Sequence, residues 1–134
     1  MQHEIEDAYA SEDAALTLCD RGTVDGVAYW VGDGELLASV GTTLEAELAR
    51  YALVIHLRTP TANHGYNHVN PLRTESPEEA AAIDERIQVA WAKHPRRQII
   101  EATDDFMTKA SRVIEILRAE LPACCQGHVK AHAR

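Results

Sequence analysis

Charged residues follow two short apolar runs of the chain, and this placement is the first sign of chemistry in the sequence. Asp20 and Arg21 come directly after Leu16–Cys19, and Arg58 comes directly after Ala52–Leu57. Short apolar runs bounded by polar residues are typical of buried strands. In open parallel α/β sheets, ligands bind beyond the carboxyl ends of the strands. The sequence therefore predicts that Asp20, Arg21 and Arg58 lie at a ligand site.

The elements that would position these residues alternate along the chain. A third strand is predicted over Gln98–Ala102. The run that begins Ser76-Pro77-Glu78-Glu79 has the features of a helix start, namely an N-cap serine, proline in the first turn and glutamate three residues after the cap. A second long helix is predicted over Asp105–Leu121, where apolar residues recur at helical spacing. Strands alternating with helices indicate βαβ units, so the predicted fold is α/β with a parallel sheet and flanking helices.

The sequence also predicts two shorter helical segments and one long connection. A helical turn is predicted within Thr23–Val31, and a helix from Thr42 or Thr43 to about Arg50, with Thr42 in a capping box. The polar stretch Thr61–Thr74 contains glycine and proline, and a connection of this length is typical of a lid or binding loop. Trp30 and Trp91 are interpreted as core or interface residues rather than cofactor contacts.

Composition limits the partners of the chain. Its 134 residues indicate one domain, and the hydrophobic share of 46% and the charged share of 25% are ordinary globular values. The net charge of −8 does not favour extended contact with nucleic acid or with an anionic membrane. A local group of arginines can still hold one small phosphorylated ligand.

The sequence also indicates a cytoplasmic protein. No apolar run approaches the roughly 18 residues that a membrane span requires. Met1–Ala10 carries acidic residues and has no apolar signal region. The chain has three cysteines, two of them adjacent, which is not a disulfide framework and fits a reducing compartment.

The C-terminal segment is interpreted as a polar, disordered tail over residues 124–134, after a domain that covers residues 1–123. Cys124, Cys125, His128 and His132 are four possible zinc ligands. Adjacent cysteines fit poorly with the gap of two to four residues that is usual between zinc-binding cysteines, so the tail is the favoured interpretation.

One segment carries a family resemblance. Residues 19–30 read CDRG-T-V-D-G-V-A-Y-W, and this block resembles a segment of a family of small AAA-type ATPases, which are similar to ribosylnicotinamide kinase and related P-loop nucleotide kinases. The resemblance covers about residues 1–123. Further matches in the same order are Val54–Pro60, Gly65–Asn67, Asn70–Glu75, Ala82–Arg86, Trp91 and Asp105–Ala110.

The resemblance implies a P-loop NTPase fold that uses ATP and Mg²⁺ in phosphoryl transfer. Asp20 would end a Walker B-like strand and help to hold Mg²⁺, and Arg21 would contact a phosphate or the phosphoryl acceptor. The alternative for this pair is a local turn with a surface ion pair. Arg58 would line the same cleft.

The long connection would then form the lid of the site. The resemblance implies that Arg73 closes over the phosphates of the ligand. Tyr66 and Asn67 complete the implied set of substrate- and phosphate-binding residues. The alternative is a set of solvated loop residues that form turns around Gly65.

The sequence departs from the family at the phosphate-binding loop. Such proteins begin with a strand and the motif G-x-x-x-x-G-K-[ST], and no pair of glycines in this chain has that spacing. The chain thus resembles the C-terminal two-thirds of the family, without its first strand and P-loop. Three interpretations fit: a truncated gene, a start codon assigned too far downstream, or a domain with a changed role.

Two functional hypotheses follow. The first is a P-loop ATPase or small-molecule kinase in truncated form, inactive by itself. The alternative is a non-catalytic remnant that binds a nucleotide or a protein. Because a missing central strand would leave strand edges unpaired, a homo-oligomer is expected in either case, or else a chain that is marginally stable and prone to aggregation.

Overall fold

The structure is a computed structural model that describes residues 2–10, 16–32, 35–59, 76–102 and 105–126. It divides into two compact units, which are described separately. The first unit comprises residues 1–20 and 105–134, and the second comprises residues 21–104. The helices of the described residues are α1 (Gln2–Ala10), α2 (Asp25–Tyr29), α3 (Leu36–Ser39), α4 (Leu44–Leu48), α5 (Pro77–Ala90), α6 (Phe106–Glu120) and α7 (Ala123–Gln126).

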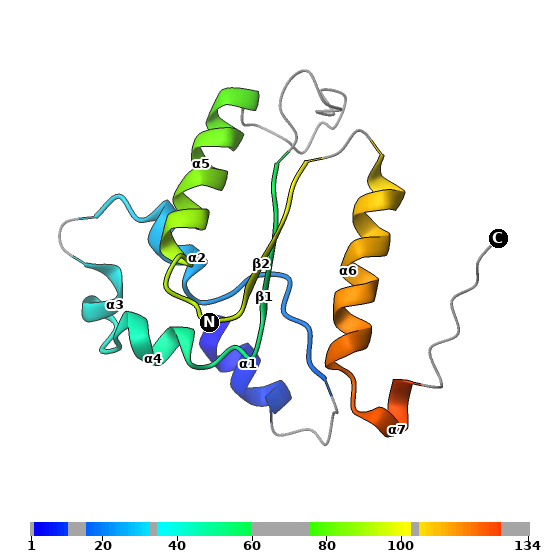
Figure 1. Cartoon of the computed structure of the whole chain (residues 1–134). Helices are drawn as coiled ribbons and strands as arrows, with labels where there is room; N and C mark the ends of the chain where they lie inside the picture. Colours follow the sequence, from blue (N-terminus) through cyan, green and yellow to red (C-terminus); the bar gives the residue numbers. More distant parts are fainter. Residues whose placement is uncertain (1, 11–15, 33–34, 60–75, 103–104, 127–134) are drawn as a thin grey trace. The chain divides into compact units, whose positions relative to one another are not determined.

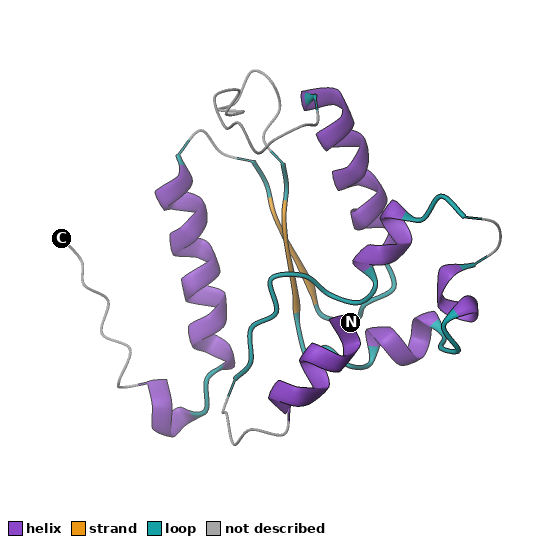
Figure 2. Ribbon diagram, turned by 180° about the vertical axis from the view of Figure 1, so that it is seen from behind, coloured by secondary structure: helices purple, strands orange, loops and turns teal. Residues whose placement is uncertain are grey.

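A parallel pair of strands lies in the second unit. β1 (Val54–Leu57) pairs with β2 (Arg97–Ile100), and Val54 lies opposite Arg97 in the register. Figures 1 and 2 show α5 running beside this strand pair, with α2 next to the C-terminal half of α5. Parallel strands need a long crossover connection, and α5 belongs to the one between β1 and β2. The predicted α/β class with a parallel sheet and helices is therefore confirmed.

The core of the second unit forms where α2, α4 and the end of α5 meet. Val24 is fully buried, and Leu48 and Trp91 are nearly so. Tyr51 packs its ring edge-on against Trp91, with ring centroids 5.1 Å apart. Trp91 is thus a core residue, as predicted. Trp30 is 42% exposed, so it is not a core residue, and an interface role for Trp30 stays a prediction.

The start of α5 follows the sequence signal closely. The Ser76 hydroxyl accepts a hydrogen bond from the backbone N–H of Glu79, and the Glu79 carboxylate accepts one from the backbone N–H of Ser76. Pro77 occupies the first helical position, where a missing N–H costs nothing. The predicted capping box is confirmed, and the helix ends at Ala90, three residues before the predicted end.

The predicted first strand is wrong. Residues 16–19 are described, and they form no strand. Leu18 is 65% exposed, and Cys19 is exposed as well. A strand requires a neighbour that completes its backbone hydrogen bonds, and an apolar run of four residues carries no information about whether such a neighbour exists. In the described part of the chain, β1 and β2 pair with each other only.

The N-cap of α4 is one residue later than the capping-box prediction placed it. The Thr43 hydroxyl accepts a hydrogen bond from the backbone N–H of Ala46. Thr42 instead donates its hydroxyl hydrogen to the buried carboxylate of Glu47, at 2.7 Å. Two consecutive threonines give nearly the same N-cap signal in the sequence. Because the hydroxyl of Thr42 binds the Glu47 carboxylate, Thr43 is the residue that caps the helix.

In the first unit, α6 has the range that its apolar periodicity predicted. The Asp105 carboxylate caps its start by accepting hydrogen bonds from the backbone N–H groups of Met107 and Thr108. Along α6, Phe106 is 75% exposed and Ile114 is 46% exposed. No helix within the described residues is long and apolar enough to cross a membrane.

Candidate functional site

The residues predicted to carry chemistry are spread over both units and a part of the chain that is not described. Asp20 belongs to the first unit and is exposed. Arg21 belongs to the second unit, and its guanidinium lies 3.5 Å from the carboxylate of Asp25, four residues ahead in the sequence. Arg58 directly follows β1. Tyr66, Asn67 and Arg73 lie outside the described residues.

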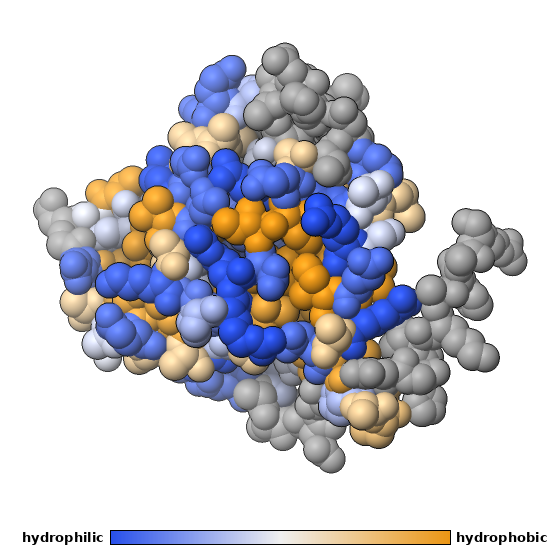
Figure 3. All heavy atoms as spheres, in the orientation of Figure 1, coloured by the Kyte–Doolittle hydropathy of each residue, from blue (hydrophilic) through white to orange (hydrophobic). Residues whose placement is uncertain are grey.

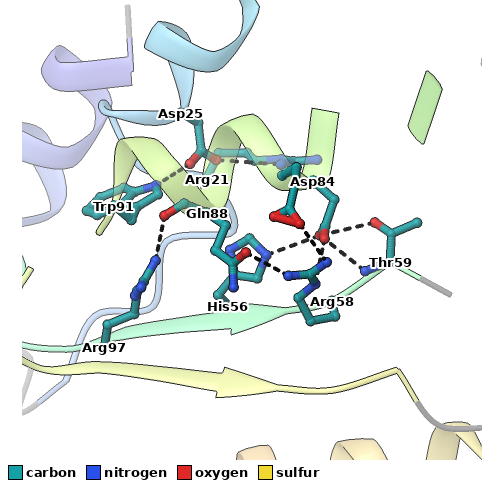
Figure 4. Close-up of polar contacts among 10 residues, drawn as sticks. Arg21, Asp25, His56, Arg58, Thr59, Asp84, Gln88, Trp91 and Arg97 are labelled. Atoms are coloured by element: carbon teal, nitrogen blue, oxygen red, sulfur yellow. Dashed lines mark hydrogen bonds and ion pairs between the residues drawn. The ribbon is translucent and has the colours of Figure 1, made fainter. Parts of the chain in front are cut away.

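The end of β1 is held by a carboxylate of α5, as Figure 4 shows. The Nε of Arg58 lies 2.8 Å from Oδ2 of Asp84. The Asp84 side chain is only 6% exposed, and that of Arg58 is 25% exposed. Removing one partner of a buried ion pair typically costs about 3–5 kcal/mol, because the other charge stays buried without compensation. The pair therefore fixes where the guanidinium of Arg58 can lie.

The second oxygen of Asp84 binds two further parts of the same strand end. Its Oδ1 lies 3.1 Å from Nε2 of His56 and accepts a hydrogen bond from the backbone N–H of Thr59, also at 3.1 Å. The Thr59 hydroxyl lies 3.4 Å from the same oxygen. Since a carboxylate only accepts, this contact is a hydrogen bond in the tautomer of His56 that carries its proton on Nε2. One buried carboxylate thus holds both the end of β1 and the first residues after it.

Gln88 extends this network to the second strand. Its side-chain oxygen accepts a hydrogen bond of 2.7 Å from Nη1 of Arg58. Its backbone oxygen accepts one of 2.5 Å from Nη1 of Arg97, the first residue of β2. Asp84 and Gln88 are four residues apart on α5 and so lie on one face of the helix. That face therefore carries polar contacts to both strands.

A second set of contacts explains much of the CDRG block. The carboxylate of Asp25 accepts a hydrogen bond of 2.6 Å from the indole N–H of Trp91. The hydroxyl of Tyr51 accepts one of 2.7 Å from the backbone N–H of Thr23. A Cβ atom added to Gly22 would lie 2.5 Å from the Trp91 ring, so only glycine fits there. These residues of the block hold the segment after Arg21 against the core.

The ion pairs of Arg58 limit which ligands can bind at the end of β1. Arg58 also lies 3.6 Å from the Glu85 carboxylate through Nη2. Its role as a phosphate ligand stays a prediction, and a phosphate there would meet a guanidinium already shared with Asp84, Glu85 and Gln88. Among the described residues, no three His, Cys, Asp or Glu side chains gather in a way that could hold a metal ion. The magnesium role of Asp20 likewise stays a prediction.

The sequence did not predict that His56, Asp84 and Gln88 belong to this network. The sequence did contain one signal for them. His56 interrupts the apolar run Ala52–Leu57, and a polar side chain inside a buried strand needs a hydrogen-bonding partner. The helix that begins at Ser76 follows that strand in the predicted βαβ arrangement, so its polar residues were the place to search. Which of them faces the strand depends on the helix rotation, which tertiary packing sets.

The parallel strand pair with its helical crossover is compatible with the fold of P-loop NTPases. Comparison with protein families agrees with this class, because residues 1–109 match the family described as AAA domain. The chain therefore belongs to the AAA domain family. No curated protein and no solved structure gave a match.

Proposed function

We propose that this chain is a nucleotide-binding domain of the P-loop NTPase type, with ATP and Mg²⁺ as the expected ligands. The observation that carries the proposal is the match of residues 1–109 to the AAA domain family. The position of Arg58 and Thr59 supports it, because they follow β1 at the edge of a parallel strand pair where such sheets bind ligands.

The finer part of the proposal is a resemblance to small-molecule kinases such as ribosylnicotinamide kinase. In this proposal Asp20 helps to hold Mg²⁺ and Arg21 contacts a phosphate or the phosphoryl acceptor. The remaining ligand contacts are assigned to Arg58, Tyr66, Asn67 and Arg73. An arginine is suited to this task because its planar guanidinium donates two parallel hydrogen bonds to a phosphate.

We expect this chain by itself to release phosphate from ATP no faster than the uncatalysed background. P-loop NTPases position the β- and γ-phosphates with backbone N–H groups and a lysine. The printed sequence contains no G-x-x-x-x-G-K motif that would supply them. A steady release of phosphate by the purified chain, abolished by Asp20→Ala, would contradict this expectation and indicate an active ATPase.

Nucleotide binding can be tested by isothermal titration calorimetry with ATP, with and without Mg²⁺. We expect binding to require Mg²⁺ and to weaken about tenfold or more in Arg21→Ala and in Arg73→Ala, since hydrogen bonds to charged groups contribute about 1.5–3 kcal/mol. Arg21→Lys should also weaken binding, because an ammonium group is not a planar fork. Arg112→Ala is the matched control, because it removes one exposed positive charge from α6 and Arg112 is not among the assigned residues.

The alternative function is a non-catalytic module that binds another protein. The exposed apolar side chains of the strand pair favour this reading, since Leu57 is 47% exposed and Ile99 is 37% exposed. The calorimetry separates the two functions. No binding of ATP at millimolar concentration by the wild-type chain removes the nucleotide proposal and leaves the protein-binding alternative. Equal affinity in wild type and Arg21→Ala removes only Arg21 from the site.

A further inference from the structure

Two adjacent cysteines stand at the start of the single turn α7, in the first unit. The Sγ atoms of Cys124 and Cys125 lie 3.6 Å apart. Cys124 is exposed and Cys125 is partly exposed. Neither residue belongs to the network around Asp84 or to the residues assigned to nucleotide binding. The pair is therefore a separate group of nucleophilic side chains that the proposed function does not use.

We propose that Cys124 and Cys125 form a reversible dithiol–disulfide site that is oxidised by small disulfides of the glutathione class. The Cys124 thiolate attacks one sulfur of the small disulfide, forms a mixed disulfide and releases one small thiol. The Cys125 thiolate then attacks the Cys124 sulfur, closes the Cys124–Cys125 bond and releases the second small thiol. The protein loses two electrons and two protons, and the small disulfide gains both as it becomes two thiols.

The geometry favours the second step within one chain. A disulfide bond is about 2.05 Å long, so the two sulfurs, now in contact at 3.6 Å, need to approach by about 1.5 Å. Because the cysteines are neighbours in sequence, the second thiol is always present beside the first. Any mixed disulfide at Cys124 therefore has an internal thiol within reach before a second protein molecule can meet it.

The same geometry makes the closed form easy to reduce. Adjacent Cα atoms are about 3.8 Å apart across a trans peptide, whereas ordinary disulfides join Cα atoms about 4.4–6.8 Å apart. A bond between neighbours is thus strained, and strained or exposed disulfides are the labile ones. In a reducing compartment the site is expected to rest as the dithiol and to close under oxidative conditions.

Closing the ring should also change the backbone of α7. The backbone N–H of Cys125 donates a hydrogen bond of 2.8 Å to the carbonyl oxygen of Pro122. An eight-membered ring through the two cysteines is not compatible with a relaxed helical turn at the same residues. We therefore expect the Cys125 amide to lose this bond on oxidation, which gives the site a structural readout besides its mass.

The test equilibrates the full chain with oxidised and reduced glutathione, quenches with acid and identifies the products by mass spectrometry. Cys19→Ser is the background, because it removes the third cysteine, which is exposed. In this background the chain should lose two hydrogen atoms and carry no glutathione. The matched variants Cys124→Ser and Cys125→Ser, in the same background, should each keep a stable glutathione adduct.

Three results would overturn the proposal. The first is a stable glutathione adduct on the chain that retains both cysteines, because the internal thiol then does not resolve it. The second is a disulfide-linked dimer as the main product. The third is a closed ring that millimolar reduced glutathione does not reopen. Loss of the exchange protection of the Cys125 amide on oxidation, and its return on reduction, is the expected structural counterpart.

Discussion

At the scale of single residues, the indole of Trp91 determines what its neighbours can be. Its N–H needs an acceptor, because the residue is 3% exposed, and the Asp25 carboxylate provides one. Its ring faces the backbone of Gly22, which leaves no room for a side chain there. Gly22 is thus required by close approach and not by its backbone angles, since Gly41 is the glycine with positive φ in the described residues.

Gly22→Ala tests this packing directly. The added Cβ would lie 2.5 Å from Cζ2 and 2.7 Å from Cη2 of Trp91, which is buried and cannot move aside. We expect the free energy of unfolding to fall by about 1–3 kcal/mol, the usual cost of overpacking. Urea denaturation followed by tryptophan fluorescence measures it.

The control for this variant is Gly26→Ala, which lies in α2. There the added Cβ would meet only the end of the flexible Leu36 side chain, at 3.1 Å. In addition, alanine is the better helix former, by about 1 kcal/mol. We expect Gly26→Ala to be close to neutral. The same urea midpoint for both variants would show that Trp91 can adjust, and that the CDRG block is not fixed by this contact.

At the scale of elements, the sequence predicted best those helices whose ends carry their own signals. The capping box at Ser76 determines where α5 begins without help from the rest of the chain. Strands β1 and β2 were found to within two residues at each end, because apolar runs bounded by polar residues have few alternatives. Residues 16–19 show the same pattern and form no strand, because strand formation depends on a partner elsewhere.

The candidate site was less predictable than the elements, for a related reason. Arg58 was found because it follows an apolar run, which is a local property. Asp84 was not found, although its carboxylate holds Arg58, His56 and Thr59. α5 carries several acidic residues, and only the packing of the helix on β1 determines which one is buried. The local sequence was therefore enough to predict where the strand ends. Which residues of α5 bind the end of the strand depends on tertiary packing.

The N-cap of α6 gives a prediction that depends on pH. The hydroxyl of Thr108 and the backbone N–H groups of Met107 and Thr108 bind the Asp105 carboxylate and lower its pKa from the ordinary value of 3.8. A lowered pKa in the folded state means that the stabilisation is fully present above pH 3.8 and is lost as the pH falls through the folded-state pKa. We expect Asp105→Ala to lower the thermal stability of the helix at neutral pH.

The pH dependence distinguishes the charged cap from a general loss of packing. The difference in stability between wild type and Asp105→Ala, followed by circular dichroism, should shrink as the carboxylate becomes protonated. Asp105→Asn is the control, because asparagine caps helices well and does not titrate. A difference between wild type and Asp105→Ala that is the same at neutral and acid pH would rule out the carboxylate as its cause.

At the scale of the whole molecule, the small sheet raises the question of what covers it. Figure 3 shows apolar atoms at the surface of the face that it draws, and in the strand pair the side chains of Leu57 and Ile99 are exposed. Parallel sheets are normally buried on both faces, and a sheet of two strands is seldom stable by itself. Within the described residues of the second unit, β1 and β2 form the whole sheet. Each strand thus has a second edge that no other described strand completes.

We therefore expect the purified chain to be a dimer or larger oligomer, or to be marginally stable and prone to aggregation. Open strand edges and exposed apolar surface both favour association between copies of a chain. Joining the chain to a strand and P-loop segment taken from another member of its family should produce a stable monomer, because that strand would occupy an open edge. Static light scattering at micromolar concentration measures both states.

A single result would refute this view of the sheet. If the chain is a monodisperse monomer and unfolds cooperatively at roughly 45–65 °C, as ordinary domains do, the sheet is complete without further strands. The side chains of Leu57 and Ile99 would then be exposed apolar residues on the surface of a monomer. Leu57→Lys separates the cases, because a charge on an interface side chain disrupts oligomers, while a charge on an exposed side chain of a monomer changes its stability little. Dissociation of an oligomer by Leu57→Lys, without loss of helical structure, is the outcome that we expect.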